Sequence, residues 1–329
     1  MLPPPSPATT QPIPTVNYPL PSVPQSVPIT TWTSLSDWTA QHKLGAPQRL
    51  NNVPVAAYAV ASRNGTMVLE IGSREVTWNG IQVSLGFAPQ VIDGAVCLYG
   101  LDLQKTLEPL LCDPPLEFHT NDIIVIDPGH GGSNSGAPSV LGEHFEREYT
   151  LDLALRLKPL LEAEGWKVFL TRTGDEDVSL ADRVAFAEEH HANFFISLHF
   201  NSAGADTKQA GVETYCLTPT GMPSTITRNF ADPWSENLPD NAFDAQNLQL
   251  ALHIQNALVH MGIPDRGVRR ARFIGVLRNQ KRPSILIEGG YLSNPREAKL
   301  IATPDYRQKL AVTLAAALKP DVESGNEGK

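Results

Sequence analysis

The chain contains few cysteines, and they lie far apart. Its 329 residues include three, Cys97, Cys112 and Cys216. Three scattered cysteines are too few for a cysteine-based zinc site or a disulfide scaffold. Cys97 and Cys112 could form one disulfide, although buried free thiols are the favoured interpretation.

Positive charge and long apolar runs are also scarce. Lysine and arginine total 26 against 35 aspartates and glutamates, which gives a net charge of -9. This charge would repel the phosphate backbone of nucleic acid and argues against nucleic-acid binding. No stretch approaches the roughly 20 apolar residues of a membrane-spanning helix. The first residues, MLPPPSPATT, lack the charged and apolar regions of a secretory signal, so we expect no transmembrane segment and no visible signal peptide.

Length and proline distribution predict two modules that follow a spacer. The 329 residues exceed the roughly 100 to 200 residues of one compact domain. Residues 1–30 hold ten of the 28 prolines, together with serine, threonine and glutamine. This composition favours an extended polyproline II spacer, with a peptide-recognition motif as the alternative. We predict a proline-rich disordered spacer at 1–30, a small β-rich accessory domain at 31–115, a larger α/β domain at 118–320 and a tail at 321–329.

Turn signals divide residues 32–111 into β-hairpins. Asn64-Gly65 lies between AVAS and TMVLEIG, Asn79-Gly80 lies between EVTW and IQVSLG, and Asp93-Gly94 precedes AVCLYG. Asn-Gly and Asp-Gly between alternating runs are strong hairpin signals. This part of the chain is therefore predicted to be a small β-rich domain.

The stretches VTWNGIQVSLG and AVCLYGLDLQKTLEPLL resemble the copper-amine-oxidase-like N-terminal domain, which is appended to many bacterial envelope proteins. The resemblance does not imply copper here, because the segment offers only His42 and no cluster of metal ligands. It implies a binding or positioning module.

Beyond about Glu117 the pattern changes to alternating strands and helices. Such alternation predicts an α/β fold with a mostly parallel sheet covered by helices on both faces. Ser179 with Asp182 is typical of a helix N-terminus, and no internal repeats are present. The predicted strands are 123–127, 167–171, 193–198, 211–217 and 284–288, and the predicted helices are 147–164, 180–190, 245–261 and 304–318.

Three of these strands end in side chains that can bind a metal or transfer a proton. His130 follows the run IIVIDPG, His199 ends FFISLH, and Glu288 ends SILIE. The carboxy ends of parallel strands line one edge of a sheet, where catalytic groups collect. Catalytic zinc typically has three protein ligands from histidine and carboxylate side chains. The third ligand is expected from FEREYTLDLALRL, which offers Glu146 and Glu148 at a helix start.

Several of these residues also have a purely structural interpretation. His130 could be only a turn residue, and a glutamate that opens a helix often only stabilises the helix dipole, which is the better interpretation for Glu148. His144 is a rival ligand that we expect to face solvent. Glu288 is harder to explain structurally, because an unpaired buried charge is costly. We therefore expect Glu288 to face a metal or a reactive cleft.

The order of these motifs resembles a known enzyme family. The segments DPGHGGSNSGA, EREYTLDLALRL, VFLTRT, ISLHFNS, GVETY, DRGVRRARFIGVLR and SILIEGGYLSNPREAKLI cover nearly all of residues 120–318. They occur in the order found in zinc-dependent N-acetylmuramoyl-L-alanine amidases of the type 3 family. The resemblance makes 118–320 the expected zinc amidase catalytic domain.

The resemblance also implies roles for four residues and one zinc ion. The zinc ligands would be His130 of GHGG, Glu146 of the helix-opening pair and His199 of the SLHFN motif. The catalytic glutamate would be Glu288. Two replacements, Arg147 for lysine and Tyr291 for phenylalanine, leave every required group in place.

The activity implied by the resemblance is hydrolysis of the amide between N-acetylmuramic acid and L-alanine in peptidoglycan. This reaction serves cell-wall remodelling or daughter-cell separation. The alternatives are another zinc peptidase or amidohydrolase acting on cell-wall peptides, and a non-catalytic peptidoglycan-binding relative. Each function implies the cell envelope, either periplasmic or extracellular.

Basic residues gather between Arg266 and Arg282 in this acidic chain. They could hold the carboxylates of the peptide stem, and a solvated basic loop is an equal alternative. By family motif, Arg172 and Asn201 are candidates for orienting substrate or supporting the site. The basic residues are Arg266, Arg269, Arg270, Arg272, Arg278, Lys281 and Arg282.

The connection from Thr218 to Asn247 is long, and long loops are often functional lids or disordered. In some members of the family an insertion here carries a helix that blocks the zinc. We predict a substrate-gating loop on which an activator protein could act, with a constitutively open loop as the alternative. If the loop blocks the site, deletion of Phe230 to Asp240 is expected to raise activity.

Overall fold

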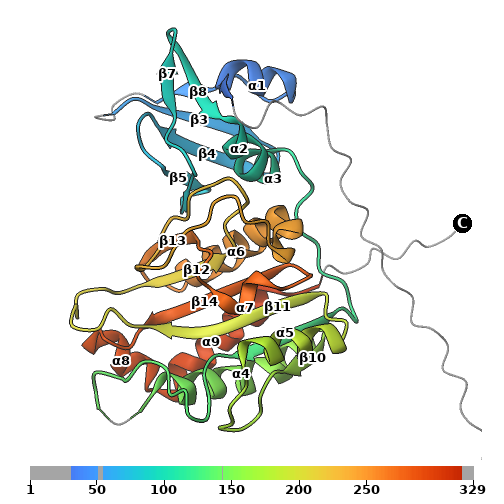
Figure 1. Cartoon of the computed structure of the whole chain (residues 1–329), viewed down its shortest axis with the longest axis vertical. Helices are drawn as coiled ribbons and strands as arrows, with labels where there is room; N and C mark the ends of the chain where they lie inside the picture. The colour runs from blue at the N-terminus through green and yellow to red at the C-terminus, as the bar shows by residue number, and fades with distance from the viewer. Residues whose placement is uncertain (1–30, 51–54, 143, 321–329) are drawn as a thin grey trace, which may run out of the picture.

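The computed structural model describes residues 31–50, 55–142 and 144–320 (Figure 1). The predicted spacer at 1–30 and the predicted tail at 321–329 lie outside these residues. Within the described part of the chain, eleven strands form one sheet in the order β10-β9-β11-β14-β12-β13-β6-β5-β4-β3-β2. No helix in these residues is long and apolar enough to cross a membrane.

Six strands of the larger region form one half of this sheet. They are β9 (Ile123–Pro128), β10 (Lys167–Leu170), β11 (Phe194–Asn201), β12 (Val212–Cys216), β13 (Asp265–Arg270) and β14 (Ser284–Tyr291). The β10–β9, β9–β11, β11–β14 and β12–β13 pairs are parallel, and the β14–β12 pair is antiparallel. The predicted mostly parallel sheet is confirmed. Strand β13 was not predicted, because its sequence DRGVRR has almost no alternation of apolar and polar residues. Its strand conformation depends on pairing with β12 and β6, the strands on either side of it.

Helices cover both faces of this half, as predicted. Helices α4 (Glu146–Ala163), α6 (Asp244–Val259) and α9 (Pro304–Ala317) share one apolar core with one face of the sheet, and α5 (Leu180–Glu189) and α7 (Gly275–Arg278) share a smaller core with the other face. The alternation of strand side chains assigns residues to these faces. In β9, Ile124 and Ile126 lie in the larger core and Val125 lies in the smaller one.

The predicted helix boundaries agree with the structure to within two residues. At the start of α5, the Ser179 hydroxyl accepts a hydrogen bond from the Asp182 amide, as predicted. The short helices α7 and α8 (Pro295–Ile301) were not predicted from the sequence. Both are too short to display a helical period.

The N-terminal region is β-rich, as predicted. The turns at Asn79-Gly80 and Asp93-Gly94 have the positive φ angles of two-residue hairpins. The first turn lies at Arg63-Asn64, one residue earlier than predicted, because Ser62 pairs with Gly65. The strands are β1 (Trp32–Ser34), β2 (Gln48–Arg49), β3 (Ala57–Ser62), β4 (Gly65–Glu70), β5 (Glu75–Trp78), β6 (Ile81–Ser84), β7 (Gln90–Ile92) and β8 (Ala95–Tyr99).

Helical segments in this region were missed by the β-hairpin signals. Helix α1 (Leu35–Gln41) buries Leu35 and Trp38, and it begins where the Ser34 hydroxyl accepts from the Asp37 amide. After β8 the chain forms α2 (Gly100–Asp102), the π-helical turn η1 (Leu103–Leu107) and α3 (Glu108–Leu111). Cys97, Cys112 and Cys216 are all free thiols.

Strand β6 joins the two regions into one sheet. Val83 of β6 pairs in parallel with Val268 of β13, and the Gln82 amide donates to the Asp265 carboxylate at 2.9 Å. On the helical side, Arg270 donates to the Thr106 hydroxyl at 2.8 Å. Strands β2 to β6 therefore extend the larger sheet, whereas β1, β8 and β7 form a separate three-stranded sheet. Domain boundaries read from the sequence do not reveal this continuity.

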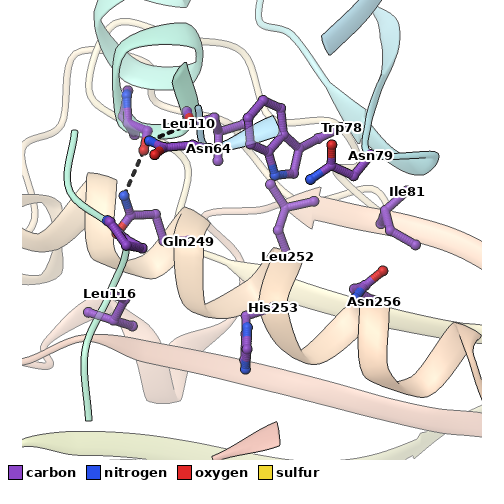
Figure 2. A pocket seen from close by; sticks show the side chains of 12 residues that line it. Asn64, Trp78, Asn79, Ile81, Leu110, Leu116, Gln249, Leu252, His253 and Asn256 are labelled. Atoms are coloured by element: carbon purple, nitrogen blue, oxygen red, sulfur yellow. Dashed lines mark hydrogen bonds between the residues drawn. The ribbon is translucent and has the colours of Figure 1, made fainter. Parts of the chain in front are cut away.

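A cavity of about 250 Å³ lies at this junction. Figure 2 shows Trp78 of β5 above Leu252 of α6, with Asn256 on the next turn of the same helix. The Gln249 side chain donates to the Pro109 carbonyl at 2.6 Å, which ties α6 to the helical run that follows β8.

Candidate active site

The turn after β9 directs His130 to the carboxy edge of the sheet. His130 has a φ of 62°, and Gly131 and Gly132 that follow it also have positive φ. Such backbone is unfavourable for a residue with a Cβ and persists only where the surroundings hold it. Here Arg183 provides support, because its guanidinium donates to the His130 carbonyl at 2.7 Å.

Arg172 supports the same turn through hydrogen bonds to its backbone. It is 2% exposed, and its guanidinium donates to the carbonyls of Pro128 and Gly129 at 3.0 and 2.8 Å. A further hydrogen bond reaches the Arg147 carbonyl at 2.8 Å. Of the two alternatives for Arg172, its contacts favour support of the site over contact with substrate.

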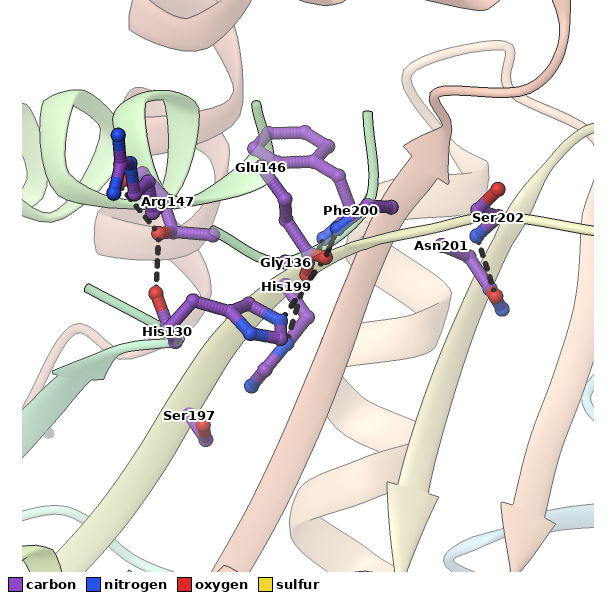
Figure 3. Close-up of polar contacts among 12 residues, drawn as sticks. His130, Gly136, Glu146, Arg147, Ser197, His199, Phe200, Asn201 and Ser202 are labelled. Carbon is purple, nitrogen blue, oxygen red and sulfur yellow. Dashed lines mark hydrogen bonds and ion pairs between the residues drawn. The ribbon is translucent and has the colours of Figure 1, made fainter. Parts of the chain in front are cut away.

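His130, Glu146 and His199 converge from three elements (Figure 3). The Nε2 atom of His130 lies 3.0 Å from Glu146 Oε2, and Nδ1 of His199 lies 2.8 Å from Glu146 Oε1. One ligand atom from each residue lies within 4.8 Å of the others. Two imidazole nitrogens and one carboxylate oxygen form a donor set that fits a divalent transition metal.

Glu146 is held in its ionised form and in a fixed orientation. Burial alone would raise the pKa of Glu146, but hydrogen bonds from His130 and His199 and their charges hold it well below its usual value. Its two oxygens also accept from the amides of Ala137 and Phe200, each at 3.0 Å. Asn134 lies 2.9 Å from Nδ1 of His130, which leaves Nε2 toward the metal-binding position.

Glu288 lies beside this group but is not part of it. On β14 it pairs with His199 of β11 on one side and with Glu213 of β12 on the other. It is 8% exposed, and its Oε2 atom has no hydrogen-bond partner within the described residues. Burial, and then the nearby Glu146 carboxylate, raise the pKa of Glu288 well above its usual value. A raised pKa suits a carboxyl group that exchanges a proton during a reaction.

All four residues line one cavity of about 360 Å³. Asn201 also lines it, and Figure 3 shows Asn201 two residues beyond His199 on β11. His144 does not join the group, because it pairs with Glu148 and its side chain is 52% exposed. Glu148 also accepts a long hydrogen bond from the Phe145 amide at the start of α4, consistent with the expected helix-stabilising role.

The basic residues between Arg266 and Arg282 are mostly occupied by internal partners. Arg266 pairs with Glu213, and Arg278 pairs with Glu236 at 2.8 Å. Arg272 pairs with Asp232 at 2.6 Å. Arg282 and Lys281 both face Glu188, and Arg270 bonds to the Thr106 hydroxyl. The solvated-loop alternative is wrong for Arg270, Arg272 and Arg282, which are buried, whereas it fits Lys281, whose side chain is 65% exposed. Binding of a substrate carboxylate by the others stays a prediction.

The structure adds two residues that sequence reasoning did not single out. Glu213 is buried and accepts hydrogen bonds from the hydroxyls of Tyr215 and Tyr291. The signal for it was a glutamate inside the buried run VETYC, the same signal that marked Glu288. Arg228, from the long connection after β12, lines the active-site cavity. Nothing in its local sequence distinguishes Arg228 from a surface arginine.

The Thr218–Asn247 connection is anchored at several points. Its one helix before α6 is η2 (Pro239–Phe243), and Leu238 and Asp240 are buried. Phe230 is 61% exposed and stacks on Phe273, which lines the cavity. Deletion of Phe230 to Asp240 would also remove the buried Leu238 and Asp240, so the expected rise in activity requires that the rest of the fold tolerates their loss. The gating role itself stays a prediction.

Gly129→Ala is expected to disable the metal site while leaving the fold intact. A Cβ at Gly129 would lie 2.3 Å from Cε1 and 2.4 Å from Nε2 of His199, so the imidazole must move. We expect the affinity for metal to fall by about 10- to 100-fold, the usual cost of misorienting a ligand. Metal titration and circular dichroism check this expectation. Unchanged metal affinity would show that His199 is not a ligand.

Comparison with known proteins agrees with this site. Residues 124–320 match the family described as N-acetylmuramoyl-L-alanine amidase. The amidase AmiA of Escherichia coli (strain K12) is 30% identical in an alignment of 218 positions that covers 59% of this chain and 73% of AmiA. The probable cell wall amidase LytH of Staphylococcus epidermidis is 31% identical over 292 residues, which are 88% of this chain and 87% of LytH. That match therefore extends into the β-rich region.

Solved structures give the same result for the larger region. The amidase AmiC2 of Nostoc punctiforme has a TM-score of 0.50 and 29% identity, covering 61% of this chain and 96% of AmiC2. The CwlD amidase of Clostridioides difficile, solved in complex with the GerS lipoprotein, has a TM-score of 0.50 and 26% identity, covering 60% of this chain and 96% of CwlD. The chain therefore belongs to the N-acetylmuramoyl-L-alanine amidase family and is a hydrolase.

Proposed function

We propose that this protein cleaves the amide between N-acetylmuramic acid and L-alanine in peptidoglycan, with one zinc ion held by His130, Glu146 and His199. The observation that carries the proposal is the position of a buried, unpartnered Glu288 in the same cavity as these three donors. A family member that had lost catalysis would lack one of these groups. All four are in place, which favours an enzyme over a non-catalytic peptidoglycan-binding protein.

The residues of the chain divide the chemistry between them. Zinc in a site of this kind supplies Lewis acidity, which polarises a carbonyl group and lowers the pKa of water from about 15.7 to roughly 7. Glu288 accepts a proton from the attacking water and returns it to the nitrogen of L-alanine as the amide bond breaks. Its Oε2 atom is free for this transfer within the described residues. The products are a glycan and a peptide that begins with L-alanine.

Product analysis tests the proposed function directly. Purified protein is incubated with muropeptides, with and without a chelator, and the products are identified by mass spectrometry. We expect release of intact stems beginning with L-alanine that stops with the chelator and returns with zinc. Cleavage inside the stem would instead show a zinc peptidase of another specificity, because the same donor set could serve that reaction.

The proposal includes a location and a partner. Amide hydrolysis in peptidoglycan places the protein in the cell envelope, where its substrate lies. A similar amidase, CwlD, was solved with a lipoprotein partner. In this protein, an activator would act on the Thr218–Asn247 segment, which contributes Arg228 to the cavity and exposes Phe230 and Trp234.

We further propose that residues 31–115 act as an accessory module for the amidase domain at 118–320. The continuous sheet through Val83 and Val268 supports a fixed placement of this module beside the catalytic region. A fixed module can position a long polymeric substrate, whereas a freely tethered one only raises its local concentration.

A further inference from the structure

Three carboxyl groups lie at or beside the active-site cavity, and one of them, Glu213, is already paired with Arg266. Glu146 and Glu288 line it, and Glu213 lies on the neighbouring strand, paired with Glu288. Among the described residues that line the cavity, Arg228 carries the single guanidinium or ammonium group. Apart from the proposed zinc ion, Arg228 is therefore the cation of this described lining that can pair with a carboxylate of a bound substrate.

Arg228 is held over the cavity by a closed ring of hydrogen bonds. Its Nη2 atom donates to Asn201 Oδ1 and to the Tyr215 hydroxyl, each at 3.2 Å. Tyr215 donates to Glu213, and Tyr291 donates to the same carboxylate at 2.6 Å. Asn201 Nδ2 closes the ring by donating to the Tyr291 hydroxyl at 3.2 Å. This ring connects three strands of the sheet to the Thr218–Asn247 segment.

The rest of the guanidinium is open to a ligand. Arg228 forms no ion pair with a carboxylate within the described residues, unlike Arg266, Arg272 and Arg278. Its Nη1 and Nε atoms have no hydrogen-bond partner there either. Arginine presents such donors as a planar fork that matches a carboxylate. The group is therefore fixed on one side and available on the other.

The backbone at this position is also unusual. Arg228 and Asn229 have φ angles of 46° and 68°, two successive left-handed residues that are not glycine. Strained backbone of this kind is concentrated at ligand-binding positions, where the surrounding contacts hold it. The stacking of the guanidinium over Tyr215 and Phe273, at 5.8 and 5.6 Å from the ring centres, supplies such contacts.

We propose that Arg228 binds a carboxylate of the peptide stem, next to the scissile amide, and thereby determines which stems are cleaved. The inference rests on the proposed amidase function and adds a specificity residue to it. The preferred substrate would carry a free carboxylate on the residue that follows L-alanine. A stem with a carboxamide at that position would lose the ion pair with Arg228.

Kinetics with paired substrates test this role. Two muropeptides are compared that differ only in a carboxylate or a carboxamide on the second stem residue. We expect Arg228→Gln to lower kcat/KM for the carboxylate substrate by about 10- to 100-fold, mainly through KM, because a charge-assisted contact is lost. The carboxamide substrate should change little. Arg228→Lys should restore part of the preference, and the exposed Arg296→Gln provides a control with the same change of charge.

The outcomes separate this inference from the proposed function. Equal losses on both substrates would show a structural role, and a gain on both would show a latch over the cavity; either result overturns the proposal. If the wild-type protein cleaves neither substrate, the proposed function fails on its own. In that case calorimetry with the two free stem peptides still tests the role of Arg228. Arg228→Gln should weaken binding of the carboxylate peptide alone. Binding that is equal in both proteins would overturn the inference.

Discussion

Glu288→Gln is expected to lower kcat by about 100- to 10,000-fold, the range typical of general acid–base catalysis. Glutamine has nearly the same shape but cannot accept the proton of the attacking water. KM should change much less, because Glu288 is proposed to act on the reacting atoms and not on the bound stem. Steady-state kinetics on a muropeptide, with products confirmed by mass spectrometry, measure both constants.

A second property of the same variant separates catalysis from folding. Glu288 is a buried carboxyl group whose Oε2 atom has no partner within the described residues. Removing such a group should leave Tm unchanged or raise it, because a residue kept for catalysis often costs stability. The exposed Glu189→Gln is the matched control and should change neither quantity. If Glu288→Gln kept full activity, the proton-transfer role would be wrong.

Loss of the metal is expected to abolish activity, and zinc should restore it. In the wild-type protein, dialysis against a chelator should remove the single ion and stop release of stems beginning with L-alanine. His199→Ala should lower metal affinity by more than about 100-fold, because removing a ligand costs more than disturbing its support. Metal content, measured by atomic spectrometry, and activity should fall together.

The control for this experiment is His119→Ala, which changes an exposed histidine away from the cluster. It should bind one ion and cleave as the wild-type protein does. A chelated protein that remains active would show that hydrolysis does not depend on the metal. A His199→Ala variant that still binds one ion tightly would remove His199 from the ligand set and would favour another donor.

The elements that present the four proposed catalytic residues could be predicted from the sequence. His130, His199 and Glu288 each end an apolar run, and the parallel alternation of strands and helices implies that such ends share one edge. These runs are recognisable because each strand is covered on both faces and is buried along nearly its whole length. Glu146 was identified by motif register, and the structure places it between the two histidines.

Only the tertiary structure showed which positive and negative side chains form ion pairs. Arg266 and Arg278 appeared free in the sequence, but folding brings them to Glu213 and Glu236. The sequence around Arg228 has no distinguishing pattern, yet in the folded protein Arg228 lines the same cavity as Glu288.

The β-strand composition of the N-terminal region followed from local turn chemistry, whereas its fusion to the larger sheet did not. The pairing of Val83 with Val268 joins strands that are far apart along the chain. The sequence by itself determined the strands, the helices and the residue types at the strand ends, because these depend on neighbours along the chain. Ion pairs, the ring around Arg228 and the order of the sheet depend on packing between distant segments, and the tertiary structure alone decided them.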